Sequence, residues 1–286
     1  MTSKERWFTA PEVPTVAEAG VPELRALGLS QAAARSLVVF QRQASAAGAA
    51  LHRGWTDWFK SQVIRRAWLA GGWIEIRSGD VDVLGELIGQ TLESSQTTLR
   101  DACRGKDPVF VAVARVWGVA SPEASWDYLQ PHLTHADLIA LERSVQEVLG
   151  AIDPKLELPL DKRWQAAVYG KSRVHSESLR KGLATTLALL GAFGDKVQLG
   201  GGATARGWAE ATVRQLLQRA NEDAGGQLWT SLSDVLELLA EAAPAQFLHA
   251  VHRGSDGDGP LLATLFTGPA PPFPPRHAHP APRVAL

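Results

Sequence analysis

The tripeptide Gly170-Lys171-Ser172 is the first place in the sequence where residue type and spacing could do chemistry. Phosphate-binding loops end in Gly-Lys-Ser or Gly-Lys-Thr, and their backbone amides hold the phosphates of a nucleotide. The pattern also requires a glycine five positions before the final glycine, where this chain has Gln165, and a preceding strand, where residues 163–169 favour helix. We therefore expect no working phosphate loop, and keep a nucleotide-dependent regulator or enzyme using this region as an alternative function.

Basic residues are densest around the same tripeptide. This candidate interaction patch consists of Arg163, Lys171, Arg173, Arg180 and Lys181. Such a patch could contact phosphate or an acidic partner. Glu177 lies within it, so a solvated face of mixed charge is the alternative reading. The whole chain has 29 Lys and Arg against 30 Asp and Glu, which gives no positive field for a nucleic-acid backbone. We therefore expect a protein partner rather than a nucleic acid.

Other residues that could bind metals or anions lack the additional ligand residues that such sites require. The eight histidines include three close pairs: His132 and His135, His249 and His252, and His277 and His279. There is no His-Glu-x-x-His arrangement and no cysteine cluster, so we predict no metal site. The glycines at 200–202 precede a helix and could offer amides to an anion, but loop chemistry favours a plain loop. No Gly-x-Ser-x-Gly nucleophile elbow appears. We therefore assign no catalytic or cofactor-binding residue and lean against an enzyme.

The single cysteine bears on both chemistry and compartment. Cys103 is the only cysteine, which excludes an intramolecular disulfide and fits a reducing cytoplasm. Its neighbours favour a thiol at a helix end over a nucleophile. Residues 1–14 do not resemble a secretory signal, and no run approaches the ~20 apolar residues of a membrane-spanning helix. We expect a cytoplasmic protein with no membrane association.

Helical periodicity is clearest after residue 130 and predicts five helices. Their first residues, as capping or first-turn signals, are Thr134 (with Asp137 as a capping box), Ser176, Thr204, Ser231 (with Asp234) and Pro244. Gly150 should end the first helix, Gly191 or Gly194 the second, and Asn221 the third. Because each helix has one apolar stripe and the corners are short, the stripes must pack against one another.

The first 130 residues predict helices less decisively. The runs Ser30–Ala50 and Thr56–Leu69 read as helices. Residues 73–84 could form a hairpin, or Asp80 could cap a helix, which we prefer because the apolar pattern outruns strand length. Residues 109–117 have the same ambiguity, and the preceding Asp107-Pro108 favours a helix start.

Taken together, these elements predict an all-α protein, either an irregular helical array or α-solenoid-like helix pairs. Residues 153–161 hold two prolines and no periodicity, so we predict an N-terminal helical region at 1–152 and a C-terminal helical-pair region at 153–267. The ten tryptophans should mostly wedge between helices. They include five near likely helix ends: Trp55, Trp117, Trp164, Trp208 and Trp229.

The last residues, 268–286, differ in kind. Residues 267–283 read TGPAPPFPPRHAHPAPR, with seven prolines, which predicts a disordered or polyproline-like tail. Two origins stay open: a natural tail that offers proline ligands to a partner, or a shifted reading frame that truncated a longer helical protein.

Two stretches, Leu156–Asp195 and Ser233–Val251, resemble a helical region of large, mostly uncharacterised bacterial multidomain proteins associated with signal-transduction ATPases and defence systems. The resemblance spans about residues 120–265 and concerns packing and turn residues. It implies one piece of a larger machine, without the nucleotide-binding part. Our leading hypothesis is a non-enzymatic α-helical protein-interaction module, or a remnant of such a multidomain protein. A nucleic-acid-associated protein that uses the basic patch is a further alternative.

Overall fold

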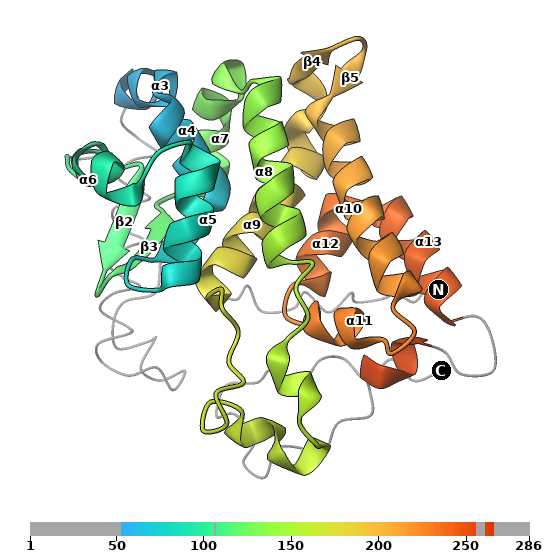
Figure 1. Cartoon of the computed structure of the whole chain (residues 1–286). Coiled ribbons are helices and arrows are strands. Elements are labelled where there is room, and N and C mark those ends of the chain that lie inside the picture. Colours follow the sequence, from blue (N-terminus) through green and yellow to red (C-terminus); the bar gives the residue numbers. More distant parts are fainter. Residues whose placement is uncertain (1–52, 106, 256–260, 266–286) are drawn as a thin grey trace, which may run out of the picture.

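The computed structural model describes residues 53–105, 107–255 and 261–265 (Figure 1). The predicted helix at Ser30–Ala50, the proline-rich tail and the pair His277 and His279 lie outside the described residues. The described part is mostly helical with two small sheets, so the all-α prediction is right in its main feature and wrong in excluding strands.

The α-helices vary in length from five to eighteen residues. They are α3 (Arg53–Lys60), α4 (Gln62–Ala70), α5 (Ser78–Ile88), α6 (Leu92–Asp101), α7 (Pro122–Leu129), α8 (His135–Val148), α9 (Glu177–Phe193), α10 (Ala205–Glu222), α11 (Gln227–Ser231), α12 (Leu236–Ala242) and α13 (Pro244–Ser255). Short 3₁₀ helices form η1 (Gln130–His132), η2 (Pro154–Glu157), η3 (Leu160–Gln165), η4 (Gly194–Lys196) and η5 (Leu261–Leu265).

The strands form one three-stranded and one two-stranded sheet. They are β1 (Gly72–Ile74), β2 (Phe110–Val113), β3 (Val116–Val119), β4 (Gln198–Gly200) and β5 (Ala203–Thr204). The larger sheet is antiparallel in the order β1-β3-β2, with Trp73 opposite Trp117. Of the two alternatives left open for residues 109–117, the favoured helix is therefore wrong and the strand is right. These residues form two strands because their aromatic and β-branched side chains pair across a hairpin.

Of the hairpin and the helix that the sequence left open for residues 73–84, the structure has the helix, because β1 pairs with β3 and residues 81–84 lie in α5. Strand β1 ends at Ile74 and α5 begins at Ser78, so the preferred helix is confirmed. Asp80 is inside α5 rather than at its cap. Its buried carboxylate accepts hydrogen bonds from the backbone N–H of Ile74 (2.8 Å) and of Ser176 (2.7 Å) and from the Ser176 hydroxyl. One carboxylate therefore joins β1, α5 and the start of α9.

Helix α9 is the central element of the fold. It packs against α4 and β1 on one side and against α8, α10 and α12 on the other (Figure 1). Its buried residues include the predicted stripe, namely Leu179, Leu183, Leu187 and Leu190. A single core cluster runs from Trp55 to Ala250 through this helix, so the core crosses the division that we predicted at residue 152.

Three of the predicted helix starts are confirmed atom by atom. The Thr134 hydroxyl accepts a hydrogen bond from the Asp137 N–H, and the Asp137 carboxylate accepts one from the Thr134 N–H, which completes a capping box. The hydroxyls of Ser176 and Thr204 cap α9 and α10 in the same way. Pro244 opens α13, and α9 ends at Gly194, the second of its two predicted stops.

Other predicted boundaries are wrong. The helix expected at Thr56–Leu69 breaks at Ser61 into α3 and α4. Asn221 lies within α10, where its side chain accepts a hydrogen bond from the Trp229 indole (3.0 Å) and donates one to the Ala250 carbonyl (3.0 Å). Ser231 ends α11 instead of opening a helix, because its hydroxyl and carbonyl are engaged by other parts of the chain.

Candidate interaction surface

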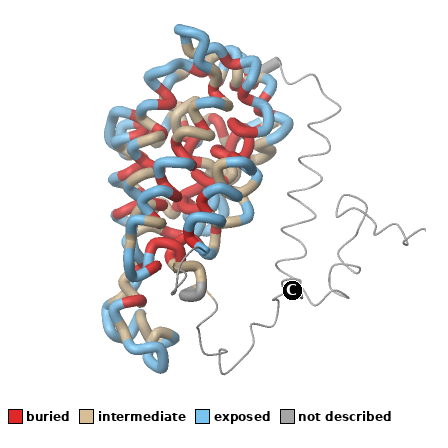
Figure 2. Tube along the Cα trace, turned by 90° about the vertical axis from the view of Figure 1, so that its right-hand side faces the viewer, coloured by how far each residue is buried: buried red, intermediate tan, exposed pale blue. Residues whose placement is uncertain are grey.

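Residues 153–173 form a projecting segment between α8 and α9, which we call the arm (Figure 1, yellow-green). It contains η2 and η3, followed by turns up to Gly170. Figure 2 shows it extending beyond the packed helices. The arm therefore projects from the packed helices and leaves about half of its residues exposed.

The arm exposes large apolar side chains. Six of the twelve exposed large hydrophobic residues of the described part lie within residues 152–174: Ile152, Leu160, Trp164, Val168, Tyr169 and Val174. We call Leu160, Trp164, Val168 and Tyr169 the apolar surface of the arm. Trp164 is 68% exposed and Val168 is 82% exposed. Elsewhere the tryptophans Trp55, Trp68, Trp73 and Trp229 are fully buried. Burial of the apolar surface of the arm would require another molecule or another part of this chain.

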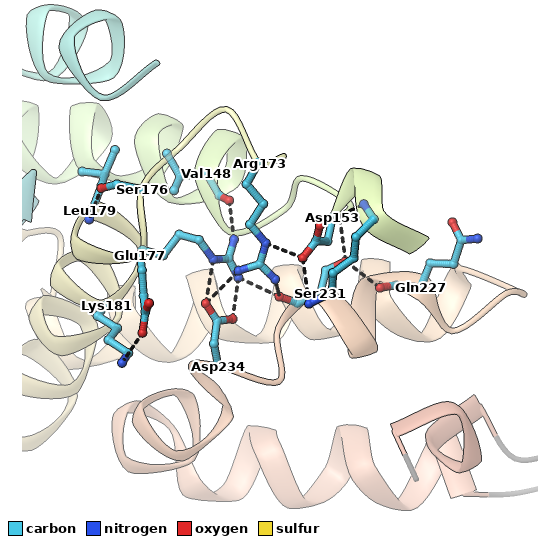
Figure 3. A network of polar contacts seen from close by, with 12 residues as sticks. Val148, Asp153, Arg173, Ser176, Glu177, Leu179, Lys181, Gln227, Ser231 and Asp234 are labelled. Atoms are coloured by element: carbon cyan, nitrogen blue, oxygen red, sulfur yellow. Dashed lines mark hydrogen bonds and ion pairs between the residues drawn. The ribbon is translucent and has the colours of Figure 1, made fainter. Parts of the chain in front are cut away.

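The base of the arm is held by a set of charged and polar residues, the arginine cluster: Asp153, Arg173, Arg180, Ser231 and Asp234. Figure 3 shows the network and labels all of them except Arg180. Asp153 begins the arm and Arg173 ends it, and their side chains form an ion pair at 2.8 Å. Arg173 also donates to the Asp234 carboxylate (2.9 Å) and to the Ser231 carbonyl (2.8 Å). Both ends of the arm are thus fixed at one point.

Arg180 connects this point to the core. Its side chain is 1% exposed and donates to both oxygens of Asp234 (2.9 Å each), to the Val148 carbonyl (2.8 Å) and to the Ser231 carbonyl (2.8 Å). The Ser231 hydroxyl in turn accepts a hydrogen bond from the Asp153 N–H (2.8 Å). A buried guanidinium is tolerated only when its donors are satisfied, and here α8, α11 and the turn that follows α11 supply the acceptors.

The electrostatics of the cluster follow from the two arginines. Burial alone would raise the pKa of Asp234, but the hydrogen bonds and charges of Arg180 and Arg173 outweigh it and lower this pKa below its usual value. Asp234 therefore stays ionised at neutral pH. The cluster has the chemistry of a structural ion-pair network, in which each charge has a partner.

Contacts between residues of the arm order its backbone. Arg163 donates to the carbonyls of Leu158 (3.0 Å) and Leu156 (3.3 Å), and Leu156 is buried. Lys171 forms an ion pair with Glu157 across the arm. These contacts fix the backbone and leave the large apolar side chains between them free of the core.

The five residues of the predicted basic patch have different surroundings. Arg173 and Arg180 meet in the arginine cluster, and Arg163 and Lys171 lie in the arm. Lys181 is exposed on α9 and pairs with Glu177 (2.6 Å). Because Arg180 is buried and its donors are used, it does not contribute to a surface. The use of the other four in binding stays a prediction.

The structure also places the residues considered for nucleotide and anion chemistry. Gly170 follows 3₁₀ helix and turns rather than a strand, and Lys171 is paired with Glu157. The glycines at 200–202 form the turn between β4 and β5, with positive φ at all three. Two clefts in the described part measure about 90 and 170 Å³, below the roughly 300–1,000 Å³ of typical small-molecule sites.

The described cysteine and histidine side chains are not arranged as a reactive or metal-binding group. Burial raises the pKa of the half-buried Cys103 thiol to about 11, against the opposing charge of Arg100, so the thiol is protonated at neutral pH. His249 and His252 are exposed on α13. Within residues 53–105, 107–255 and 261–265, no three His, Cys, Asp or Glu side chains gather in a way that could hold a metal ion. No helix in those ranges has the length and apolar character to span a bilayer.

No protein-family model, curated protein or solved structure matches the chain. The resemblance to bacterial multidomain proteins therefore stays a prediction.

The sequence reasoning missed most of the apolar surface of the arm. Trp164 was noted only as a tryptophan near a helix end, and Leu160, Val168 and Tyr169 were not singled out. A signal was present, since residues 153–169 carry large apolar side chains without the period of a helix or a strand. Such residues have no periodic face to bury and can remain exposed.

Proposed function

We propose that this chain is a non-enzymatic protein-interaction module, built as an irregular array of helix pairs, that binds a partner protein through the apolar surface of the arm. The observation that carries the proposal is the exposure of Trp164, Val168 and their neighbours on a projecting segment with a fixed base. The core is sealed without these side chains, so they do not stabilise the described fold.

The fixed base favours binding. An ordered surface loses less conformational entropy on association than a loose one, so more of the contact energy is retained as affinity. The ion pair between Asp153 and Arg173 and the contacts of Arg163 with Leu156 and Leu158 supply this order.

The residue types of the arm also suit a protein partner. Trp and Tyr are enriched among the residues that dominate binding energy in interfaces. Lys162 is exposed beside Trp164 and Arg163, and charges at an interface rim mainly affect the rate and specificity of association. An acidic rim on the partner would complement them.

The proposal is tested first by finding the partner. A photoreactive p-benzoylphenylalanine at Val168 should cross-link a specific protein in cells that express the chain, and the same residue at Phe193, which is 52% exposed on α9, should not. The protein identified is then purified and titrated calorimetrically into the full chain.

In that titration Trp164→Ala should weaken binding by at least about tenfold, the effect of losing one aromatic anchor. Phe193→Ala, an exposed aromatic away from the arm, should leave affinity unchanged. Equal affinities for both variants would contradict the proposal. ATP hydrolysis by the purified chain, abolished in Lys171→Ala, would favour the nucleotide-dependent alternative, and salt-dependent DNA binding would favour the nucleic-acid alternative.

A further inference from the structure

We infer that the apolar surface of the arm recognises proline-rich segments, and that the proline-rich segment of this same chain, residues 269–282, occupies it. This inference rests on the proposed function, because it concerns the same surface. It adds the chemistry of the occupant and a means of regulation, in which the chain's own segment competes with the partner.

The chemistry of the arm fits proline. Proline-rich segments adopt an extended helix with three residues per turn, and exposed aromatic side chains bind the pyrrolidine rings at little entropic cost. Trp164 and Tyr169 are 68% and 48% exposed within one short stretch of the arm, with Leu160 and Val168 beside them in sequence. The segment 269–282 has seven prolines, including the two pairs Pro271-Pro272 and Pro274-Pro275.

The described chain ends close to the element that holds the base of the arm. The last described residue, Leu265, ends η5, which packs against α11 and α13. Helix α11 ends at Ser231, whose hydroxyl accepts the hydrogen bond from the N–H of Asp153, the first residue of the arm. One short helix therefore contacts both the arm and the element from which the proline-rich segment continues.

The remaining chain is long enough to reach the whole arm. Twenty-one residues follow Leu265, and an extended proline-type helix rises about 3.1 Å per residue, which gives about 60 Å. Both ends of the arm meet at the arginine cluster, so even a fully extended arm projects no farther than about 35 Å, half of its contour length.

Charge adds one specific contact. Asp161 follows Leu160, is exposed and makes no ion pair with any described residue. The segment after Leu265 carries Arg276 and Arg283 and no acidic residue. Either arginine can pair with Asp161 while the neighbouring prolines contact the aromatic rings.

The test uses the purified full chain with p-benzoylphenylalanine at Val168, the most exposed apolar side chain of the arm. After irradiation and digestion, mass spectrometry should find cross-links from position 168 to peptides within residues 268–283. The yield should not depend on protein concentration, because the contact is within one chain. The same probe at Phe193 gives the background. Replacing Pro271, Pro272, Pro274 and Pro275 by alanine should reduce the yield to that background, and Asp161→Asn should reduce it partly.

Three results would overturn the inference: cross-links from position 168 to residues 1–52 instead, cross-links that join two chains, or none above the Phe193 background. The partner titration separates this failure from that of the proposed function. If Trp164→Ala weakens partner binding but no cross-link to the proline-rich segment forms, only the inference is wrong. If the cross-link to the proline-rich segment forms but no partner binds in a way that depends on Trp164, the proposed function is wrong and the contact within the chain remains. If both hold, the four-alanine variant should bind the partner more tightly than the parent chain does.

Discussion

Arg180 shows how one side chain can join distant parts of this fold. Its guanidinium meets a carbonyl of α8, a carbonyl of α11 and both oxygens of Asp234, 54 residues away in sequence. From the sequence alone, Arg180 belonged with its basic neighbours in a surface patch, because nothing local indicates that Asp234 faces it. The three hydroxyl caps at Thr134, Ser176 and Thr204 were predictable, since each depends on residues within three positions.

Removal of the buried guanidinium should be costly. Arg180→Met would leave the buried Val148 carbonyl and one oxygen of the Asp234 carboxylate without a donor, while Arg173 still donates to the Ser231 carbonyl and to the other oxygen. The loss of these contacts should lower the free energy of unfolding by about 3 kcal/mol. Lys181→Met is the matched control, because the ion pair of Lys181 with Glu177 is exposed and should change stability by less than about 0.5 kcal/mol. Urea unfolding at pH 7 measures both. Equal effects would contradict the structural importance of Arg180.

The lowered pKa of Asp234 predicts acid sensitivity. Since its pKa is lower in the folded than in the unfolded chain, the stabilisation is fully present above about pH 4, the unfolded value, and is lost as pH falls through the folded value. Asp137 behaves alike, since the arginines at 65 and 66 outweigh its burial. Asp234→Asn should lose about 2 kcal/mol at pH 7, with the difference narrowing below pH 4. A difference independent of pH down to pH 3 would contradict this.

At the scale of elements, the helices with local start signals were predictable and the small strands were not. The hairpin of β2 and β3 turns through Ala114 and Arg115, which have positive φ values of 49° and 70°. Two-residue hairpin turns of this kind normally contain Asn-Gly or Asp-Gly. Without that signal, and with Pro108 suggesting a helix start, the strand alternative for residues 109–117 could not be preferred over the helix.

Substitutions in the turn between β2 and β3 can raise the stability of the protein. Ala114→Asn combined with Arg115→Gly should raise the free energy of unfolding by about 1 kcal/mol, because both residues then fit positive φ without a steric penalty. Ala112→Gly, an exposed position in β2, is the control and should lower stability by about 0.5–1 kcal/mol. Thermal unfolding compares the variants. A double variant that is less stable than the parent would show that the turn has another conformation.

Close packing of α9 depends on glycine at two crossings. A Cβ at Gly182 would lie 2.3 Å from the Ala70 carbonyl oxygen, and one at Gly191 would lie 2.0 Å from that of Ala242. The sequence suggested Gly191 as a helix stop, whereas the structure shows it buried within the helix. Its partner is again distant in sequence, so this use could not be seen locally.

Gly191→Ala should therefore destabilise the protein by about 3 kcal/mol, since backbone atoms must move to accept the methyl group. Gly207→Ala is the matched control in α10: its added Cβ would meet only the Thr204 hydroxyl at 3.6 Å, and alanine favours helix by up to about 1 kcal/mol. Guanidinium unfolding should move the two midpoints in opposite directions. A shift of both in the same direction would contradict the described crossing of α9 and α12.

For the whole molecule, the sequence predicted a mostly helical chain, and the structure has that character around one shared core. The segment at residues 153–161 stood out because it lacked periodicity, and we read it as a region boundary. The structure shows it as part of a projection that leaves the core and returns to it. Periodicity reports which residues pack on a neighbour, so it cannot show how far an unpacked segment extends or where it returns.

The separation of arm and core predicts a distinctive response to protease. Brief trypsin treatment should cut after Lys162 or Arg163 before it cuts within α9 at Lys181, because a short 3₁₀ helix on the projecting arm opens locally at a lower free-energy cost than the 17-residue α9, which packs in the core. The two products should elute together from a size-exclusion column and separate only in denaturant, since one core includes residues from both. Products that part in native buffer would show that α9 does not pack against α4 and β1 as described.

The ion pair between Asp153 and Arg173 affects how the sequence of the arm can change in evolution. The packing of α8 and α9 depends on the contact between these two residues. It does not depend on the length or the sequence of the residues between them. Insertions, deletions and exchanges in the intervening stretch can accumulate there without refolding the remainder. Related proteins that retain the packed helices could thus acquire new binding specificity through sequence changes in about twenty residues of the arm.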